Sequence, residues 1–373
     1  MIVLIAVSFR LAGRRHTDRP YGQDEPCRGR VHVAKSTIIG AKMTIRSDIK
    51  IVAEIGLLIY PGAQLAAVYG LTDLFRIAGE WALPLEGGPR PAIRVTHWKS
   101  GPETGPEPRM ECIWDSHPGD GHSLSHVIVP PSIIMPDKMP SMQAPAAWLA
   151  GRHRAGATLC AICAGAFVLA ETGLINGRRA TTHWAFAHAL ADRFPDVEVA
   201  VERMVIDDGD IMTAGGILAW TDLGLTLVEK LMGPSTMLAT ARFLLIEPPG
   251  RQQRPFAQFI PRFDHGDAAI LRAQHHLHAT RAQTYDLAEL STISGLEQRT
   301  LLRRFRKATG LRPTEYAQEV RIAKAREQLE ATNQPVEQIA WQVGYSDPAA
   351  FRKVFQRITG VGPATYRQRF GVT

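Results

Sequence analysis

Residues 156 to 184 read GATLCAICAGAFVLAETGLINGRRATTHW. The strand-forming run ATLCAI passes directly into the helix-forming run GAFVLAETGL, and Cys163 stands at their junction. Ala161 and Gly165, two residues away on either side, are small, as a sharp strand-to-helix turn requires. The stretch therefore predicts a buried strand and a helix joined by an elbow, with Cys163 exposed on the elbow at the mouth of a pocket.

The same alternation of strand and helix patterns extends in both directions for about 180 residues. Further strands are expected within residues 51–60 (IVAEIGLLIY), 126–132 (HVIVPPS) and 207–216 (DDGDIMTAGG), and helical patterns separate them. This order is typical of an α/β fold with a mostly parallel, doubly wound sheet. Such sheets bind ligands at the carboxyl ends of their strands, which is where Cys163 is expected.

Composition and charge narrow the class of protein. The chain has 373 residues, of which 45% are hydrophobic and 21% charged, so it is long enough for two domains or more. It contains no apolar run of the roughly 20 residues that a bilayer span needs, and its N-terminus lacks the order of a signal peptide, so we expect a cytoplasmic protein without a membrane partner. Four cysteines are too few for a disulfide framework.

The C-terminal part is basic and contains an internal repeat. Its net charge is +6 over residues 267–373, against −5 over residues 51–266, which points to a polyanionic partner. The stretch FRKATGLRPTEY (305–316) recurs as FQRITGVGPATY (355–366). In each copy a short apolar-faced helix, a turn at Gly295 or Gly344 and a basic helix follow one another, which describes two helix-turn-helix units.

The long helical pattern of residues 313–332 separates these units and would act as a rigid spacer. Two basic helices on one rod can enter successive major grooves on one face of double-stranded DNA, about 34 Å apart. Residues on the outer faces of the basic helices, spaced away from core positions, are expected to contact bases; they are Arg299, Thr300, Arg303, Ala350, Arg352 and Lys353. Neighbouring basic residues are expected to contact phosphates; they are Arg304, Arg306, Lys307 and Arg357.

Over about a hundred residues, RIAKAREQLE, IAWQVGYSDPAAFRKVF and TGVGPATYR resemble the DNA-binding domain of AraC/XylS-family regulators. The stretches YPGAQLAAVYGLTDLF, AICAGAFVLAETGLINGRRATTHW and TAGGILAWTDLGLTLVE resemble the ThiJ/PfpI superfamily, which has a glutamine-amidotransferase-like, flavodoxin-type fold. Together they look like a GlxA-type transcriptional regulator. The resemblance implies a DNA-binding homodimer controlled by a small effector, and related regulators of nitrogen metabolism suggest amino acids or quaternary amines.

The sequence is accordingly divided into four parts. Residues 1–46 lack periodicity and are expected to be an unstructured leader, from either a start codon assigned too early or a disordered basic arm. The ThiJ/PfpI-like sensing domain is expected over residues 47–235, a Pro/Gly/Arg-containing connector over 236–266 and the DNA-binding domain over 267–373.

Whether Cys163 is catalytic depends on its partners. Peptidase-like members of the superfamily have His directly after this cysteine, where the chain has Ala164, and other members have Glu at the position of Gln64. We therefore expect no catalytic residues and no cofactor, and a ligand pocket formed by Gln64, Cys163, His183 and Gly215. The alternative is a cysteine-dependent hydrolase or hydratase that uses Cys163 with His183.

Two other patterns suggest chemistry that the spacing argues against. Cys160 and Cys163 have the spacing of a redox pair, but residues three apart on a strand point to opposite faces. The histidines of QHHLHAT (274–280) lack the i, i+4 pairing that places two metal ligands on one helical face, so no metal site is expected.

Overall fold

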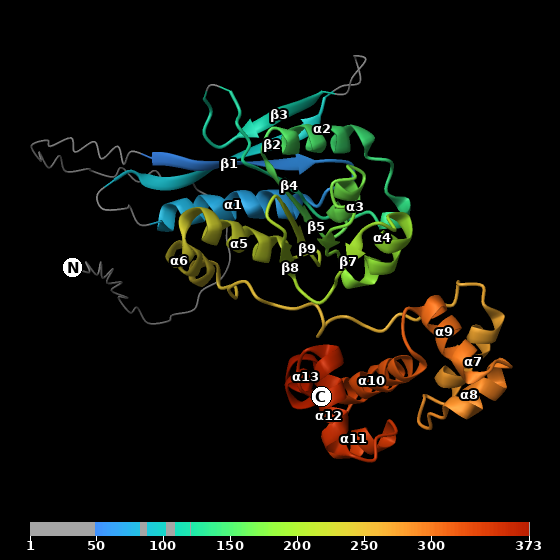
Figure 1. Ribbon diagram of the computed structural model, residues 1–373. Coiled ribbons are helices and arrows are strands. Elements are labelled where there is room, and N and C mark those ends of the chain that lie inside the picture. The colour runs from blue at the N-terminus through green and yellow to red at the C-terminus, as the bar shows by residue number, and fades with distance from the viewer. Residues whose placement is uncertain (1–48, 83–87, 102–108, 120, 373) are drawn as a thin grey trace, which may run out of the picture. The chain divides into compact units, whose positions relative to one another are not determined.

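The computed structural model describes residues 49–82, 88–101, 109–119 and 121–372 (Figure 1). The predicted leader, residues 1–46, lies outside the described residues. Apolar, β-branched runs form a seven-stranded sheet in the order β3-β2-β1-β4-β5-β9-β8. The five inner strands are parallel, while β3 and β8 pair antiparallel at the two edges. The strands are β1 (Ile49–Ile59), β2 (Arg90–Ser100), β3 (Met110–Asp115), β4 (His126–Val129), β5 (Thr158–Ile162), β8 (Val205–Asp207) and β9 (Ile211–Ala214).

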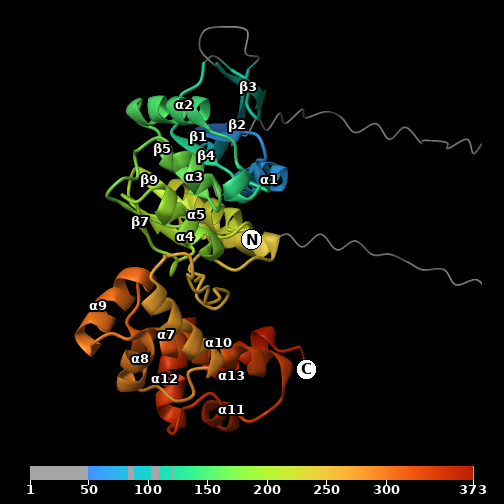
Figure 2. The same ribbon diagram turned by 90° about the vertical axis from the view of Figure 1, so that its right-hand side faces the viewer.

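Helices cover both faces of this sheet, so the predicted α/β fold with a mostly parallel sheet is confirmed (Figures 1 and 2). One face carries α1 (Leu65–Trp81), α5 (Trp220–Met232) and α6 (Pro234–Leu244), and the other carries α2 (Gln143–Arg154), α3 (Gly165–Ala170) and α4 (Ala187–Arg193). A separate two-stranded parallel sheet pairs β6 (Arg179–Ala180) with β7 (Glu198–Val199). Short 3₁₀ helices, η1 (Pro136–Lys138) and η2 (Trp184–Phe186), complete this α/β region.

The predicted start of the connector at residue 236 is wrong. Residues 234–244 form α6, whose Met237 and Ala241 are buried in the same apolar cluster as the inner faces of α1 and α5. Pro234 begins the helix, and Leu245 ends it in the left-handed conformation. The spacing of its apolar residues lets this helix pack into the core of the α/β region. The connector, which contains no helix or strand, runs from Leu245 to Asp267.

After the connector the described chain is helical. The helices are α7 (Ala268–Ala279), α8 (Leu287–Ser294), α9 (Gln298–Thr309), α10 (Pro313–Ala331), α11 (Val336–Gln342), α12 (Pro348–Thr359) and α13 (Pro363–Phe370). The predicted helix-turn-helix units are α8 with α9 and α11 with α12, and α10 is the spacer. Both turn glycines, Gly295 and Gly344, have positive φ.

Each unit has its own apolar core. Leu301 and Phe305 of α9 are fully buried in one, and Phe351 and Phe355 of α12 in the other, as their spacing predicts. Repeated Gly and Pro residues end each basic helix and begin the next, as the sequence repeat predicts. Nowhere in the described ranges does a helix have the length and apolar character needed to cross a membrane.

Candidate functional site

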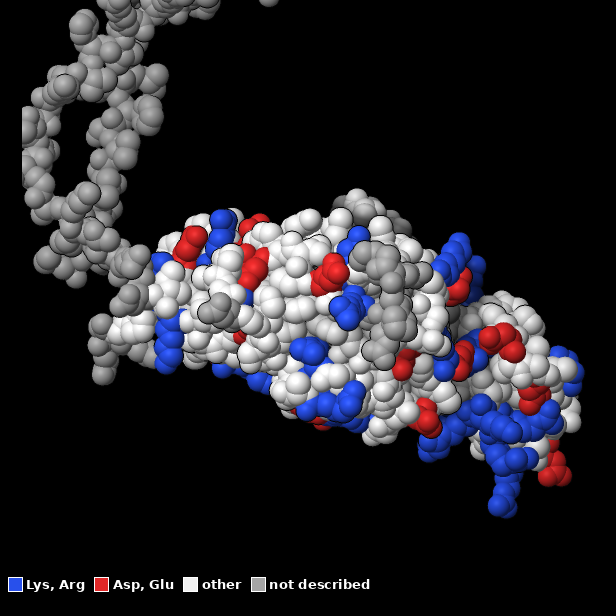
Figure 3. Space-filling model, turned by 90° about the horizontal axis from the view of Figure 1, so that it is seen from above, with Lys and Arg blue, Asp and Glu red and all other residues white. Residues whose placement is uncertain are grey.

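The first basic helix, α9, places its predicted base-contacting residues outward. Because Leu301 and Phe305 anchor one side of the helix in the core, Arg299 and Arg303 are exposed and Thr300 is half-buried on the other side. Lys and Arg side chains gather over the helical region in Figure 3. A groove runs beside α9, with basic and apolar walls formed by Tyr285, Leu287, Gln298, Arg299, Leu302, Arg303, Arg306, Lys307, Arg312 and Thr314.

The second basic helix, α12, repeats this arrangement. Asp347 accepts hydrogen bonds from the backbone amides of Ala349 and Ala350, at 2.8 and 3.1 Å, which fixes the start of the helix. Ala350, Arg352 and Lys353 are exposed. Arg352 forms an ion pair with Glu337 of α11, and because both partners are exposed this pair holds the guanidinium only weakly.

The residues predicted to contact phosphates differ in whether their side chains are already bonded to other residues. Arg306 and Lys307 are exposed, and Arg357 donates to Gln318 of α10 at 2.5 Å. Arg304 instead donates two hydrogen bonds to Asp267, at 2.6 and 2.9 Å, and thereby lowers the pKa of that carboxyl. Since Asp267 also caps α7 through Ile270, the prediction that Arg304 is a free phosphate contact conflicts with this structural role.

Side-chain contacts join the two helix-turn-helix units in addition to the covalent connection through α10. Arg321 of α10 donates to the carbonyl oxygens of Ala282 and Gln283, in the loop between α7 and α8, at 2.5 and 3.1 Å. Its guanidinium lies 5.3 Å from the ring centroid of Tyr345. Gln283 in turn donates to the carbonyl of Gln342 at 2.9 Å. The side chains of Arg321, Gln283 and Tyr345, which we call the bracket, therefore join the two units in addition to α10. The sequence analysis did not predict these contacts.

Cys163 lies on the predicted elbow but is not exposed. Its φ of 55° is the left-handed conformation that a non-glycine residue rarely adopts, and its amide donates to Ala214 of β9 at 2.7 Å. A Cβ at Gly165 would lie 2.7 Å from the carbonyl oxygens of Val129 and Pro130, which explains why this position is glycine. The Cys163 side chain is only 1% exposed, so the expectation of a thiol open to solvent at a pocket mouth is wrong.

Burial also governs the chemistry of the thiol. It raises the pKa of Cys163 to about 11, although hydrogen bonds from the backbone amides of Ala164, Gly216 and His183 act in the opposite direction. Burial lowers the pKa of the His183 imidazole, whose Nδ1 accepts from the amide of Ala185 at 3.1 Å. At neutral pH the thiol and the imidazole are both neutral, and the contact of His183 with the sulfur is made by its backbone amide.

Cys160 also carries a buried free thiol, and burial raises its pKa to about 12. The expectation that it points away from Cys163 is wrong, because both side chains belong to one apolar cluster. Cys163 has left the pleat of β5 at the elbow, so strand alternation does not apply to it. Cys112, Cys160 and Cys163 are all free cysteines.

Gln64 and Gly215 complete the predicted pocket. Gln64 precedes α1 and donates its backbone amide to Pro131 at 2.7 Å, and its side-chain oxygen is buried without a hydrogen-bond partner among the described residues. Gly215 is not open space, because a Cβ there would lie 1.9 Å from Nε2 of Gln253. Backbone contacts join Cys163, His183 and Gly216, and the side chain of Gln253, from the connector, fills the space beside Gly215.

This side chain, Gln253, is a residue that the sequence analysis missed. It is 2% exposed although it lies in a segment without helix or strand. Its carboxamide oxygen accepts from the amide of Trp184 at 3.0 Å, and its nitrogen donates to Thr181 Oγ1, Thr182 O and Arg203 O at 2.9, 3.0 and 3.2 Å. A glutamine among Pro and Arg residues gives no sequence signal of burial.

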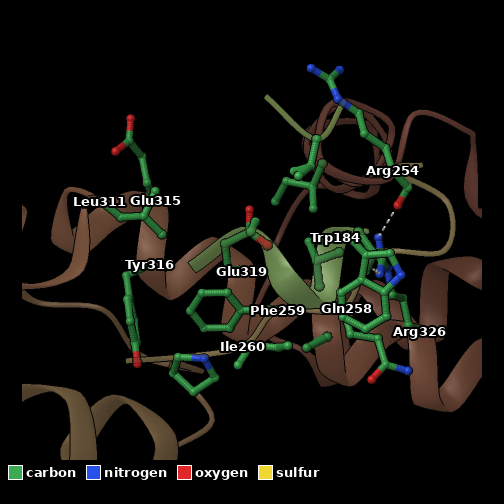
Figure 4. Close-up of a pocket in the computed structure, with 18 of the residues that line it drawn as sticks. Trp184, Arg254, Gln258, Phe259, Ile260, Leu311, Glu315, Tyr316, Glu319 and Arg326 are labelled. Atoms are coloured by element: carbon green, nitrogen blue, oxygen red, sulfur yellow. Dashed lines mark hydrogen bonds between the residues drawn. The ribbon is translucent and has the colours of Figure 1, made fainter. Parts of the chain in front are cut away.

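The residues just after Gln253 contact the helical region. Arg326 of α10 donates to the carbonyl oxygens of Arg254, at 3.1 Å, and Ala257, and Figure 4 shows the first of these bonds. Phe259 packs edge-to-face on Tyr316, with ring centroids 5.0 Å apart. The connector is therefore held by side chains of both regions within seven residues.

The described ranges contain no group of three or more His, Cys, Asp and Glu side chains that could hold a metal ion. The histidines of the 274–280 stretch have separate partners. His275 stacks on Phe263, His276 pairs with Glu289, and His278 shares a hydrogen bond with Tyr316 at 2.8 Å. These contacts pack α7 against its neighbours.

Comparison with known proteins matches both regions. A model of the DJ-1/PfpI family matches residues 123–230, and one of a helix-turn-helix domain matches residues 290–369. Over 221 residues the chain is 30% identical to the HTH-type transcriptional regulator GlxA of Rhizobium meliloti, covering 58% of this chain and 67% of that protein. It is 29% identical to the HTH-type transcriptional regulator CdhR of Pseudomonas aeruginosa, covering 59% and 66%. Over 76 residues it is 42% identical to isonitrile hydratase of Pseudomonas putida, covering 20% and 32%.

Proposed function

Because the chain belongs to the family of HTH-type transcriptional regulators that includes GlxA, with a DJ-1/PfpI domain joined to an AraC-type helix-turn-helix domain, we propose that a small metabolite bound beside Cys163 controls how it binds DNA. The predicted class of protein, a DNA-binding transcriptional regulator, is confirmed. The effector, the contact residues and the oligomeric state are parts of the proposal.

The proposal that the chain binds DNA rests on its two basic helices, α9 and α12, whose basic side chains face outward. The spacer helix α10 and the bracket hold the two helix-turn-helix units together. Arg299, Arg303, Ala350, Arg352 and Lys353 are exposed where each helix would enter a major groove. Arg306 and Lys307 are exposed beside them and are assigned to phosphates. Arg304 is assigned to the stability of the first unit rather than to DNA.

The effector part rests on the surroundings of the elbow. Backbone amides converge on Cys163, the oxygen of Gln64 is buried without a partner among the described residues, and the connector reaches this neighbourhood through Gln253. An effector changes DNA binding only if it binds one arrangement of the chain better than another. A thermal-shift screen of amino acids, quaternary amines and other metabolites, followed by footprinting with each hit, tests this part. A hit that stabilises the protein and alters the footprint is expected, and stabilising hits that leave every footprint unchanged would contradict control by the effector.

A homodimer is proposed from the apolar surface of the α/β region. Leu65 and Tyr69 of α1, with Ile133 and Leu218, are between 49% and 69% exposed. The amide of Ile133 donates to Gly62, just before α1, and Leu218 stands two residues before Trp220, whose ring packs at Gly70 of α1. Large exposed apolar side chains close together are typical of interaction surfaces. Light scattering of the purified protein should give twice the mass of the 41.0 kDa chain, and a monomer at micromolar concentration would refute the dimer.

A cysteine-dependent hydratase is the second candidate, favoured by the identity to isonitrile hydratase. The raised pKa of Cys163 and the hydrogen bond that occupies Nδ1 of His183 oppose it, because a nucleophilic thiol must ionise near neutral pH. Turnover of isonitriles, nitriles, amides and aldehydes by the wild type, lost in Cys163→Ala with DNA binding intact, would establish the enzyme. We expect no turnover.

A further inference from the structure

The polar slot that holds Gln253 is built by residues of the α/β region. Thr181 and Thr182 are fully buried directly after β6, although both are polar. Thr181 donates its amide to Thr213 of β9 at 2.9 Å, and Thr182 donates its hydroxyl to the carbonyl of Cys163 at 2.8 Å. These bonds hold the walls of the slot independently of its occupant.

The arrangement of donors and acceptors is specific for a primary carboxamide. One amide N–H, from Trp184, points to the oxygen of the Gln253 side chain, and three acceptor oxygens surround its nitrogen. A carboxylate has the same shape, but it would place an anionic oxygen against those three acceptors. Gly215 lets the nitrogen approach, since any Cβ there would overlap it.

Gln253, which fills the slot, belongs to the connector, and the residues that follow it bond to the spacer helix α10. Arg254 and Ala257, one and four residues after Gln253, offer their carbonyls to Arg326 of α10, which is itself 7% exposed. Leaving the slot would remove the four side-chain hydrogen bonds of Gln253 from this side of a segment that the spacer helix holds on the other. The ion pair of Arg251 with Asp222 and the backbone bonds of Arg251 and Gln253 would still attach residues 251–253 to the α/β region. Thr182 also links the slot to the backbone of Cys163, where the effector is proposed to bind.

We propose that this slot is a carboxamide-binding site with Gln253 as its resident ligand, and that its occupancy couples the Cys163 elbow to the DNA-binding domain through the connector. The ligand class that can replace Gln253 is a small primary carboxamide. The binding site stands on the described contacts alone, whereas its effect on DNA rests on the proposed function.

Chemical rescue of Gln253→Ala tests the site. This variant removes the CH₂–CONH₂ group and leaves a space for acetamide, a molecule of the same size and polarity. We expect its Tm to lie about 4 °C or more below that of the wild type, because buried polar groups lose their partner. Acetamide, at a concentration on the order of 10 mM or more for so small a ligand, should raise the Tm of the variant more than that of the wild type.

Control compounds and control variants show which results would contradict a carboxamide site. Acetate and N,N-dimethylacetamide lack the N–H donors and should not rescue, and Gln258→Ala, at an exposed connector position, should keep the wild-type Tm. Gln253→Glu retains the shape without the donor and should also lower the Tm. An unchanged Tm in both Gln253 variants, or equal rescue by acetate, would overturn the assignment of a carboxamide site.

Trypsin and DNA report on the coupling. The Arg251 side chain is paired with the buried Asp222, and trypsin can cleave after it only when this segment opens. Loss of the Gln253 bonds should make opening more frequent, so cleavage after Arg251 should be about tenfold faster in Gln253→Ala than in the wild type. Acetamide should not reverse it, because it fills the slot without holding the connector. The DNA affinity of the full-length variant should differ from that of the wild type by about threefold or more, and an unchanged affinity would overturn the coupling. If the wild type itself binds no DNA, the proposed function fails, while the Tm and trypsin experiments still test the slot.

Discussion

Nε of Arg321 lies 2.5 Å from the carbonyl oxygen of Ala282, so the spacer helix α10 is bonded to the loop that precedes the first helix-turn-helix unit. The same guanidinium covers the ring of Tyr345 in the turn of the second unit. The relative orientation of the two recognition helices, which sets the spacing of the grooves they can enter, therefore depends on one arginine as well as on the rod.

Replacing Arg321 by Met removes these charged donors and keeps the length of the side chain. The carbonyls of Ala282 and Gln283 lose their partner, so we expect unfolding to become easier by about 1–3 kcal/mol and protection in one of the two major grooves to weaken. Denaturant titration and footprinting measure both effects. Lys324→Met, which breaks an exposed ion pair with Glu327 on the same helix, is the control and should change stability by less than about 1 kcal/mol. A two-groove footprint of wild-type strength in Arg321→Met would refute the bracket.

Gly344→Ala tests the other side of the bracket. Gly344 has φ +88°, and a Cβ there would lie 2.5 Å from the carbonyl oxygen of Gln283, so the new methyl group would push the two units apart. Gly310→Ala provides the comparison, because its φ is +76° but the space around it is open. We expect Gly310→Ala to destabilise the protein by about 1 kcal/mol, from backbone strain alone, and Gly344→Ala by clearly more. Equal losses of unfolding free energy would contradict close contact at the turn.

Arg304 and Arg306, two residues apart in α9, should separate stability from DNA affinity. Arg304→Ala removes the partner of Asp267 and should lower the free energy of unfolding, with little change in the salt dependence of DNA binding. Arg306→Ala should leave stability nearly unchanged and reduce the slope of log K against log [salt] by about 1. The reverse assignment, with Arg304 carrying the salt dependence, would show that its pair with Asp267 opens on DNA.

The buried thiols predict a loss of stability in alkali. The pKa of Cys163 is raised to about 11 and that of Cys160 to about 12, so both stay protonated in the folded protein while the unfolded chain releases its protons near pH 9. Their contribution is complete below pH 9 and is lost as the pH rises towards 11 and 12. Cys163→Ala should therefore make the free energy of unfolding fall less steeply between pH 9 and 11. An identical pH dependence in wild type and variant would argue against a raised thiol pKa.

Alkylation rates report on the same group at neutral pH. A thiol with a pKa near 11 has a thiolate fraction about a hundredfold below that of an ordinary cysteine, and Cys163 is also buried. Iodoacetamide should modify Cys163 in the folded protein at least about a hundredfold more slowly than in denaturant, as followed by peptide mass spectrometry. Rapid native modification at pH 7 would favour the enzymatic alternative.

Hydrophobic periodicity and the internal repeat predict those features of the fold that depend on local sequence. The elbow at Cys163, the mostly parallel sheet, the core positions Phe305 and Phe351 and the two basic helices all follow from side-chain spacing and from Gly and Pro positions. Pro and Gly residues near helix α6 predict a domain boundary there, although the apolar residues of this helix complete the core of the α/β region.

Contacts between residues distant in the sequence escaped prediction. Gln253 lies about 70 residues from Thr182, and Arg321 about 40 from Ala282, and neither position shows a local pattern. The burial of Cys163 is not predicted for a similar reason, since the turns at Gly216 and His183 that enclose its sulfur come from other parts of the chain. Such contacts follow from packing, which a single sequence does not display.

Binding to its own upstream region tests most directly whether this chain reads a DNA sequence with two recognition helices held by the spacer helix. Fluorescence anisotropy at fixed salt should show at least about a hundredfold preference for that region over random DNA, with protection of two successive major grooves and weaker binding as salt rises. Equal affinity for upstream and random DNA would contradict sequence-specific reading by these helices.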